Sequence, residues 1–339
     1  MPFIDNILNY KSIAIVGLEK NTGKTECLNY VVEKLSQRDI KIALTSIGID
    51  GESIDAVTNT PKPEIELPKN TVFVTLEKFY NQRKLVSEVI DLSKTSGFLG
   101  RYVTARSLSK GKVILAGPSS TDELKSYLDK LSENNNIVVV DGALSRLSLA
   151  SPAITDCMIL NTGAAVSTSA KQLVDKTKFT VDLINLPKAN LKNRDDLLAI
   201  ENGIFGIDEN DLQHKLDIPS GFLLSQNKTD IFHYGKRIFV SGALSNQFLN
   251  FVISQPNSGH SAIIVKDFTK VFATKDVFEK YIRCGGKIEV VERTNLLAVC
   301  LNPLAPNGFV FDSEGIRNKL SQAINMSVYD VRHLRKTVI

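Results

Sequence analysis

The chain lacks the sequence signatures of several large classes of protein. Its 339 residues include no tryptophan and only four cysteines, none of which forms the Cys-x-x-Cys pair typical of zinc and redox sites. No apolar run reaches the roughly 18 residues of a membrane-spanning helix, and none near the start has the form of a secretory signal. The net charge of +4, from 41 basic and 37 acidic residues, is too small to indicate nucleic-acid binding. We therefore expect a cytoplasmic protein that binds neither nucleic acid nor a membrane.

Short apolar segments alternate with amphipathic segments along most of the chain. The predicted strands are residues 13–16, 40–46, 72–74, 137–140, 158–160, 238–240, 262–265, 288–291 and 297–301. Helices are predicted at residues 24–37, 85–92, 121–131, 167–183 and 277–282, and around Phe248 and Val252. Residues 101–107 and 112–116 flank a Ser-Lys-Gly turn and predict a β-hairpin. The repeated alternation indicates an α/β fold with a doubly wound, mostly parallel sheet.

A glycine-containing segment lies between the first predicted strand and the first long helix. It reads Gly17-Leu18-Glu19-Lys20-Asn21-Thr22-Gly23-Lys24-Thr25, and we call it the glycine loop. In a P-loop, glycines let successive backbone N–H groups point at phosphate oxygens, and the following helix N-terminus favours negative charge. The predicted nucleotide-binding residues are Gly17, Asn21, Thr22, Gly23, Lys24 and Thr25. Lys24 would reach the β- and γ-phosphates and serve in catalysis, and the Thr25 hydroxyl would bind Mg²⁺. The alternative is a chance Gly-Lys-Thr turn.

The spacing within the glycine loop departs from the commonest P-loop. Five residues separate Gly17 from Gly23, whereas the commonest motif has four. This longer spacing resembles dethiobiotin synthetase and its relatives. Lys20 is one residue too close to Lys24 to match the variant loop that carries a second signature lysine.

Two aspartates are candidate ligands for the Mg²⁺ that accompanies a nucleotide. Asp141 ends an apolar strand and resembles the acidic residue at the corresponding place in the dethiobiotin synthetase group. Asp50 follows the second predicted strand, where the resemblance implies an aspartate that binds the metal or positions the attacking water. We therefore expect Asp141 to be a metal ligand and Asp50 to be both a metal ligand and a catalytic residue. Either carboxylate could instead be a cap or turn residue.

The alternation of predicted strands and helices is dense at both ends of the chain and sparse between them, which predicts three parts. Residues 1–186 form a predicted P-loop nucleotide-binding domain. Proline, asparagine, aspartate and glycine become frequent over residues 187–235, which predicts an irregular connecting region. Strand–helix alternation resumes over residues 236–339 and predicts a second, smaller α/β domain.

Several segments, taken in order, resemble one family. They are VGLEKNTGKT at residues 16–25, LTSIGIDGE at 44–52, DAVTNTPK at 55–62, LAGP at 115–118, VDGAL at 140–144, NTGA at 161–164 and LNPLAPNGFVFD at 301–312. This order resembles the P-loop subunit of the lysine 5,6-aminomutase reactivase, a family associated with lysine fermentation. The resemblance implies an ATPase that uses ATP and Mg²⁺ to exchange damaged cobalamin in an adenosylcobalamin-dependent lysine aminomutase. It also implies two partners, namely the aminomutase and a MutS-like reactivase subunit.

Two other functions stay open at this point. One is an ATP-dependent small-molecule ligase of the dethiobiotin synthetase type, although residues 42–46 lack the substrate-side lysine of that group. The other is a metal or cofactor chaperone, although the chain shows no Cys/His cluster. GTP also stays open as the nucleotide, because Asn227-Lys228-Thr229-Asp230 has the letters of a guanine motif without a clear strand before it.

Overall fold

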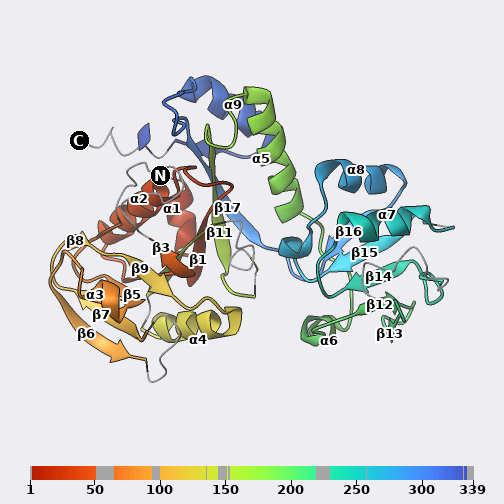
Figure 1. Cartoon of the computed structure of the whole chain (residues 1–339), viewed down its shortest axis with the longest axis horizontal. Coiled ribbons are helices and arrows are strands. Elements are labelled where there is room, and N and C mark those ends of the chain that lie inside the picture. Colours follow the sequence, from red (N-terminus) through yellow and green to blue (C-terminus); the bar gives the residue numbers. More distant parts are fainter. Residues whose placement is uncertain are drawn as a thin grey trace. The chain divides into compact units, whose positions relative to one another are not determined.

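The chain folds into two compact units (Figure 1). A computed structural model describes residues 2–50, 65–93, 100–134, 136–143, 151, 153–218, 230–256, 258–330 and 332–333. The first unit is Met1–Lys178 with Asn295–Ile339, and the second is Phe179–Thr294. Within the described residues, every helix falls short of the length and apolar character that a membrane span requires.

The first unit is built on a nine-stranded, mostly parallel sheet with the order β18-β17-β11-β1-β10-β2-β5-β7-β6. Its strands are β1 (Ser12–Gly17), β2 (Ile42–Ser46), β5 (Val72–Leu76), β6 (Ser87–Leu92), β7 (Tyr102–Ser107), β10 (Ile137–Ala143), β11 (Cys157–Gly163), β17 (Asn295–Asn302) and β18 (Val328–Tyr329). Only β7 runs opposite to the other strands of this sheet. Two short antiparallel pairs join β3 (Gly48–Asp50) to β9 (Leu115–Gly117), and β4 (Glu66–Leu67) to β8 (Gly111–Lys112). Because β1, β10 and β11 are parallel neighbours, their carboxyl ends meet at one edge of the sheet.

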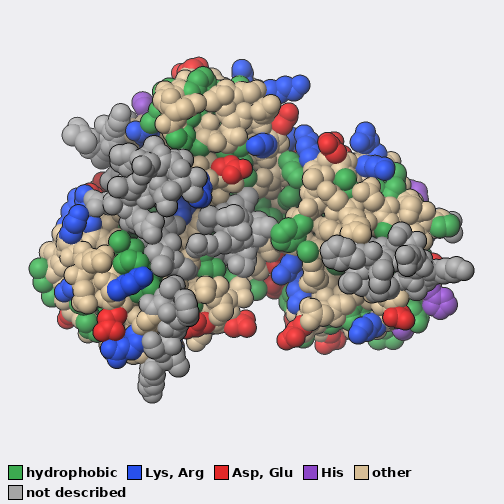
Figure 2. Space-filling view, viewed as in Figure 1, with side chains coloured by type: hydrophobic (Ala, Val, Ile, Leu, Met, Phe, Trp, Pro, Cys, Tyr) green, Lys and Arg blue, Asp and Glu red, His purple; other side chains and the backbone are tan. Residues whose placement is uncertain are grey.

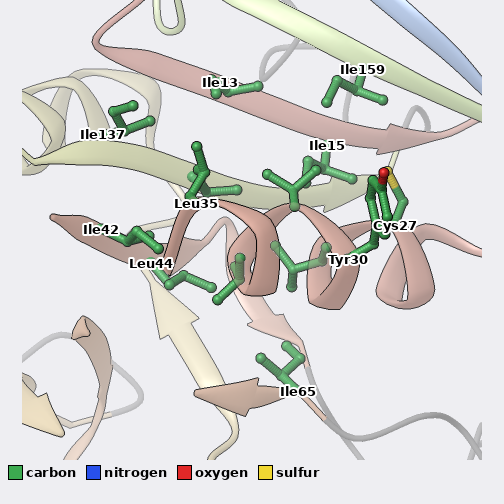
Figure 3. Close-up of a cluster of buried hydrophobic side chains, with 14 of the residues drawn as sticks. Ile13, Ile15, Cys27, Tyr30, Leu35, Ile42, Leu44, Ile65, Ile137 and Ile159 are labelled. Atoms are coloured by element: carbon green, nitrogen blue, oxygen red, sulfur yellow. The ribbon is translucent and has the colours of Figure 1, made fainter. Parts of the chain in front are cut away.

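Helices cover both faces of the central strands. On one face, helix α2 (Lys24–Ser36) packs Leu35 in a cluster with Ile13 and Ile15 of β1 (Figure 3), and Leu28 belongs to the same cluster. On the other face, helix α4 (Thr121–Ser132) packs in a cluster that includes Val138 and Val140 of β10. Each leucine-sized side chain buried in this way contributes about 1.5–3 kcal/mol to stability. Burial on both faces explains why these strands are continuous apolar runs. The remaining helices of this unit are α1 (Pro2–Ile7), α3 (Glu77–Tyr80) and α9 (Ser313–Ile324).

The second unit has its own sheet and its own core. The sheet has five strands in the order β13-β12-β14-β15-β16, and β14, β15 and β16 are parallel. Its strands are β12 (Ile204–Ile207), β13 (Gln213–Lys215), β14 (Arg237–Val240), β15 (Ala262–Val265) and β16 (Lys287–Val290). Its helices are α6 (Arg194–Ala199), η3 (Phe268–Lys270), α7 (Asn246–Ser254) and α8 (Lys275–Arg283), and α5 (Ala170–Ile184) begins in the first unit and ends in the second. Apolar clusters lie on the two faces of the sheet.

Two local predictions from the sequence are wrong. Residues 85–92 were expected to be helical, but Ser87–Leu92 is strand β6. The spacing of apolar residues in this segment fits both a helix and a strand. Its β-branched residues and its pairing with β7 favour the strand. The predicted hairpin of residues 101–107 and 112–116 is also absent, because β7 pairs with β5 and β6 instead. The strand that makes a hairpin with β7 therefore precedes it in the chain.

The two units differ from the three parts expected from the sequence. The supposedly irregular residues 187–235 contain α6, β12 and β13. Residues 295–339 were expected in the second domain, but their strand β17 pairs with β11 of the first unit. The second unit is thus inserted between two strands of the larger sheet. The chain returns to the first sheet at β17, which pairs with a strand more than a hundred residues earlier. The order of elements along the sequence does not reveal a pairing over this distance.

Candidate functional site

The glycine loop connects the carboxyl end of β1 to the first residue of α2 at the edge where β1, β10 and β11 meet. Gly23 is the N-cap of α2, and no side chain among the described residues caps this helix end. The first N–H groups of a helix have no partner within the helix, which makes a helix N-terminus a favourable place for an anion. The loop is tied to the sheet by Leu18, whose N–H donates to the Asn161 carbonyl at 2.8 Å. Strand–loop–helix geometry is therefore present as the sequence predicted.

Close contacts and backbone conformation explain why positions 17 and 23 of the glycine loop are glycines. A Cβ at Gly17 would lie 2.7 Å from the Thr22 hydroxyl oxygen, so the loop closes tightly over this position. Gly23 has φ of +86°, and a Cβ there would lie 2.8 Å from the Cβ of Asn302. The Thr22 hydroxyl is buried and donates to the Glu19 carbonyl at 2.9 Å. Thr22 thus shapes the loop through its side chain.

The charged centre of the site is an ion pair between Lys24 and Asp141. The Lys24 Nζ lies 3.0 Å from Asp141 Oδ1, and the side chains are 16% and 0% exposed. Asp141 lies in β10, directly opposite Ile15 of β1. A buried carboxylate without a partner is strongly unfavourable, so the ammonium of Lys24 neutralises it. The structure therefore brings together two of the residues that the sequence predicted for the site.

The other predicted metal ligands are less constrained. Thr25 is the second residue of α2 and is partly exposed beside Lys24. Asp50 closes strand β3, where its backbone pairs with Leu115, but its side chain is outside the described residues. Among the residues that are described, no three His, Cys, Asp or Glu side chains gather to hold a metal by themselves. A Mg²⁺ ion here would need phosphate oxygens and water as well as protein ligands, which is the usual arrangement for this ion.

Two asparagines contact the glycine loop and were not among the predicted site residues. Asn302, the last residue of β17, donates from Nδ2 to the carbonyl of Asn21 at 3.1 Å. Asn161, in β11, donates from Nδ2 to the Val16 carbonyl at 3.2 Å. Its Oδ1 is buried and has no hydrogen-bond partner among the described residues, so it is an acceptor available to a ligand or a water. The feature of the sequence that could have identified these two residues is an asparagine at or near the end of an apolar strand.

Cysteines near the loop belong to the core. Cys27 of α2 and Cys300 of β17 are fully buried, with their sulfurs 3.7 Å apart. The neighbouring Cys27 thiol and the burial of the site hold the pKa of the Cys300 thiol well above its usual value. A thiol that stays protonated is neither a nucleophile nor a metal ligand. Cys157 in β11 is buried as well, and burial raises the pKa of its thiol.

The packing of Gly23 against Asn302 predicts the effect of a single methyl group. Gly23→Ala is expected to destabilise the first unit more than Gly308→Ala does, when the free energy of unfolding is measured in denaturant. The two glycines have nearly equal φ of +86° and +87°, but a Cβ at Gly308 would meet no atom within 4 Å. The left-handed conformation alone costs about 1–2 kcal/mol in both variants. Equal losses in the two variants would show that the contact with Asn302 carries no energy.

Comparison of the chain with protein-family models, curated proteins and solved structures gives no significant match. The comparisons therefore give no support to any function, and the case for nucleotide binding is made from the geometry of the site. Of the guanine-type letters at residues 227–230, only Asp230 is among the described residues, so that motif lies almost wholly outside them.

Proposed function

We propose that the glycine loop is a P-loop that binds ATP with Mg²⁺, and that the chain uses ATP turnover to reactivate an adenosylcobalamin-dependent lysine aminomutase. The observation that carries the nucleotide proposal is the buried Lys24–Asp141 pair at the N-terminus of α2. It places a cation, a carboxylate and the N–H groups of a helix N-terminus at the carboxyl edge of parallel strands, where ligands of open α/β sheets bind. These are the groups that a Mg²⁺-bound triphosphate requires.

We expect Lys24 and Asp141 to exchange partners when a triphosphate and Mg²⁺ bind. Without ligand, Lys24 balances the charge of Asp141 at 3.0 Å. When a triphosphate and Mg²⁺ are bound, Asp141 and Thr25 would hold the metal, directly or through water, and Lys24 would turn to the β- and γ-phosphates. Asp141 then keeps a cationic neighbour throughout, so no buried charge is left uncompensated. Asp50 would complete the metal site or position the attacking water.

The assignment of ATP as the nucleotide rests on the family resemblance. The buried Asn161 Oδ1 is an acceptor without a partner among the described residues, and it could accept from the amino group of adenine or equally from the N1–H or amino group of guanine. This acceptor therefore does not select the base. Direct competition between ATP and GTP for the wild-type chain tests the assignment, and tighter binding of GTP would reverse it.

The reactivase proposal rests on the family resemblance of the segments around this site. Five of the seven segments that carry it, at residues 16–25, 44–52, 140–144, 161–164 and 301–312, contain residues of β1, β2, β10, β11 and β17, which form the central part of the sheet. In this proposal ATP drives a conformational change in the target and not the joining of two small molecules. Strand β2 (Ile42–Ser46) accordingly ends in Thr45 and Ser46 and carries no lysine for a ligase substrate.

The test mixes the chain with the MutS-like subunit and an aminomutase that carries inactive cobalamin. Mutase activity is expected to recover when ATP, Mg²⁺ and fresh adenosylcobalamin are added. The chain alone should hydrolyse ATP slowly, and the partners should accelerate it by about 5–150-fold, the range of typical allosteric coupling. Turnover of a small acid or amine by the chain alone, without mutase recovery, would make it a ligase instead.

A further inference from the structure

A short β-hairpin follows the last residue of β17, and we call residues 303–311 the aromatic hairpin. The Phe311 N–H donates to the Pro303 carbonyl at 3.0 Å, and nearer the tip the Ala305 N–H donates to the Phe309 carbonyl at 2.8 Å. These hydrogen bonds join the two arms of the hairpin, so its side chains extend from a defined backbone.

The turn at the tip of the aromatic hairpin is closed by its own residues. The Gly308 N–H donates to the Ala305 carbonyl at 3.1 Å, which closes a turn over Pro306 and Asn307. Proline fixes its own φ, and Gly308 supplies the left-handed φ of +87°. The Asn307 side chain accepts from the Phe309 N–H at 3.1 Å. The turn therefore holds Phe309 in a defined position.

The aromatic hairpin begins beside the glycine loop. A Cβ at Gly23 would lie 2.8 Å from the Cβ of Asn302, so this asparagine packs on the loop. The Asn302 Oδ1 accepts from the Leu304 N–H at 3.2 Å, so the same side chain also holds the start of the hairpin. Ala305, which pairs with Phe309, follows Asn302 by three residues and lies within about 11 Å of it. The tip of the hairpin is therefore close enough for a base to reach when the phosphates lie at the glycine loop.

An aromatic ring is exposed at this tip. Phe309 is 38% exposed, and it is the single exposed phenylalanine or tyrosine among the described residues of the first unit. Its ring contacts that of Phe311, with the centroids 4.8 Å apart and the planes at 90°. This edge-to-face contact is favourable and orients the rings, while part of Phe309 stays open to solvent. An oriented and exposed ring on a closed turn is suited to stacking against a flat aromatic ligand.

Surface charge gives an uncharged base no place to bind. On the face of the molecule that Figure 2 shows, basic and acidic side chains are interspersed, as the small net charge implies. Stacking on an aromatic side chain does hold a base, and it does so for every base because each has a π-face. The exposed ring of Phe309 offers this contact near the glycine loop without selecting between adenine and guanine.

We propose that the aromatic hairpin holds the base of the bound nucleotide, with the ring of Phe309 stacked on the face of the base. This inference rests on the nucleotide-binding function proposed above, because it takes the phosphates to lie at the glycine loop. The phosphates and the base are then bound by two segments far apart in the sequence, residues 17–25 and 303–311, which the side chain of Asn302 joins. Phe309 is a binding residue and takes no part in the chemistry at the phosphates.

The test compares a ligand that has a base with one that has none. Isothermal titration gives the affinities of ATP and of inorganic tripolyphosphate, each with Mg²⁺, for the wild type and for Phe309→Ala. The variant is expected to bind ATP about 5–150-fold more weakly, the loss typical of removing one base–aromatic stack. Its affinity for tripolyphosphate should equal that of the wild type, because the glycine loop is unchanged. Phe309→Tyr keeps a ring and should bind ATP as the wild type does, whereas Phe309→Leu lacks a π-face and should bind it more weakly.

A control variant and the base-free ligand separate loss of the base site from other effects. Phe272→Ala removes a phenylalanine of the second unit that is 57% exposed, and it should leave both affinities unchanged. Equal affinity of the wild type and Phe309→Ala for ATP would overturn the role of the hairpin and leave nucleotide binding standing. An equal loss of affinity for ATP and tripolyphosphate would mean that the change disturbs the glycine loop, and it would overturn the base site as well. A wild type that binds neither ligand would defeat the nucleotide function itself, and the base site with it.

Discussion

Lys24→Ala is expected to lower ATP turnover by about 10²–10³-fold, the loss typical of removing one electrostatic stabiliser of a transition state. It should also lower the free energy of unfolding by about 3–5 kcal/mol, because a buried charge loses its partner. That buried charge is the carboxylate of Asp141, which is 0% exposed and lies 3.0 Å from the Lys24 ammonium in the wild type. Steady-state hydrolysis and denaturant unfolding measure the two effects separately.

The double variant Lys24→Ala/Asp141→Asn distinguishes the two roles of the lysine. Removing both charges leaves no uncompensated carboxylate, so most of the lost stability should return. Turnover should stay low, since no cation reaches the phosphates. Full turnover in the purified Lys24→Ala protein would remove the glycine loop from the mechanism. An unchanged unfolding free energy would mean that the ion pair contributes nothing to the ligand-free fold.

Asp141→Asn is expected to raise the Mg²⁺ concentration needed for half-maximal turnover by about tenfold or more, a typical effect of removing a group that orients a metal site. The affinity for nucleotide should change less, because the loop backbone and Lys24 still bind the phosphates. Stability should fall less than in Lys24→Ala. The Lys24 side chain is 16% exposed, so its ammonium can reach water when the carboxylate is gone, whereas Asp141 cannot.

Titration of turnover against Mg²⁺ in both proteins checks this prediction. Asp129→Asn is a suitable control, because that carboxylate is 63% exposed and pairs with Lys125 on the surface of α4. Superimposable Mg²⁺ curves for Asp141→Asn and the wild type would reduce Asp141 to a structural partner of Lys24.

The sequence predicts the part of the site that is local in the chain. Strand β1, the glycine loop and helix α2 follow one another without interruption, and short-range pattern rules place all three. The pairing of Lys24 with Asp141 was not predicted, although both residues were chosen. It depends on β10 lying next to β1, which joins residues more than a hundred positions apart. Patterns of residues along the chain predict where strands end, but they do not predict the order of the strands in a sheet.

Long-range pairing also explains the residues that sequence reasoning missed or misplaced. Asn302 contacts Asn21 only because β17 returns to the first sheet after the inserted unit. The return was hidden because the last residues follow the second unit in the chain and continue its strand–helix pattern. Residues 85–92 were expected to be helical because their apolar residues fit a helical stripe as well as a strand. Their exposure on both faces has no signature in a single sequence.

Binding of a nucleoside triphosphate with Mg²⁺ at the glycine loop is the step on which the proposed function depends. The most direct measurement is isothermal titration of the wild-type chain with ATP, in the presence and absence of Mg²⁺, beside the Lys24→Ala/Asp141→Asn variant. We expect one site per chain for the wild type, binding that is tighter with Mg²⁺, and no measurable binding to the variant. Absence of binding to the folded wild type, or equal binding to the variant, would contradict it.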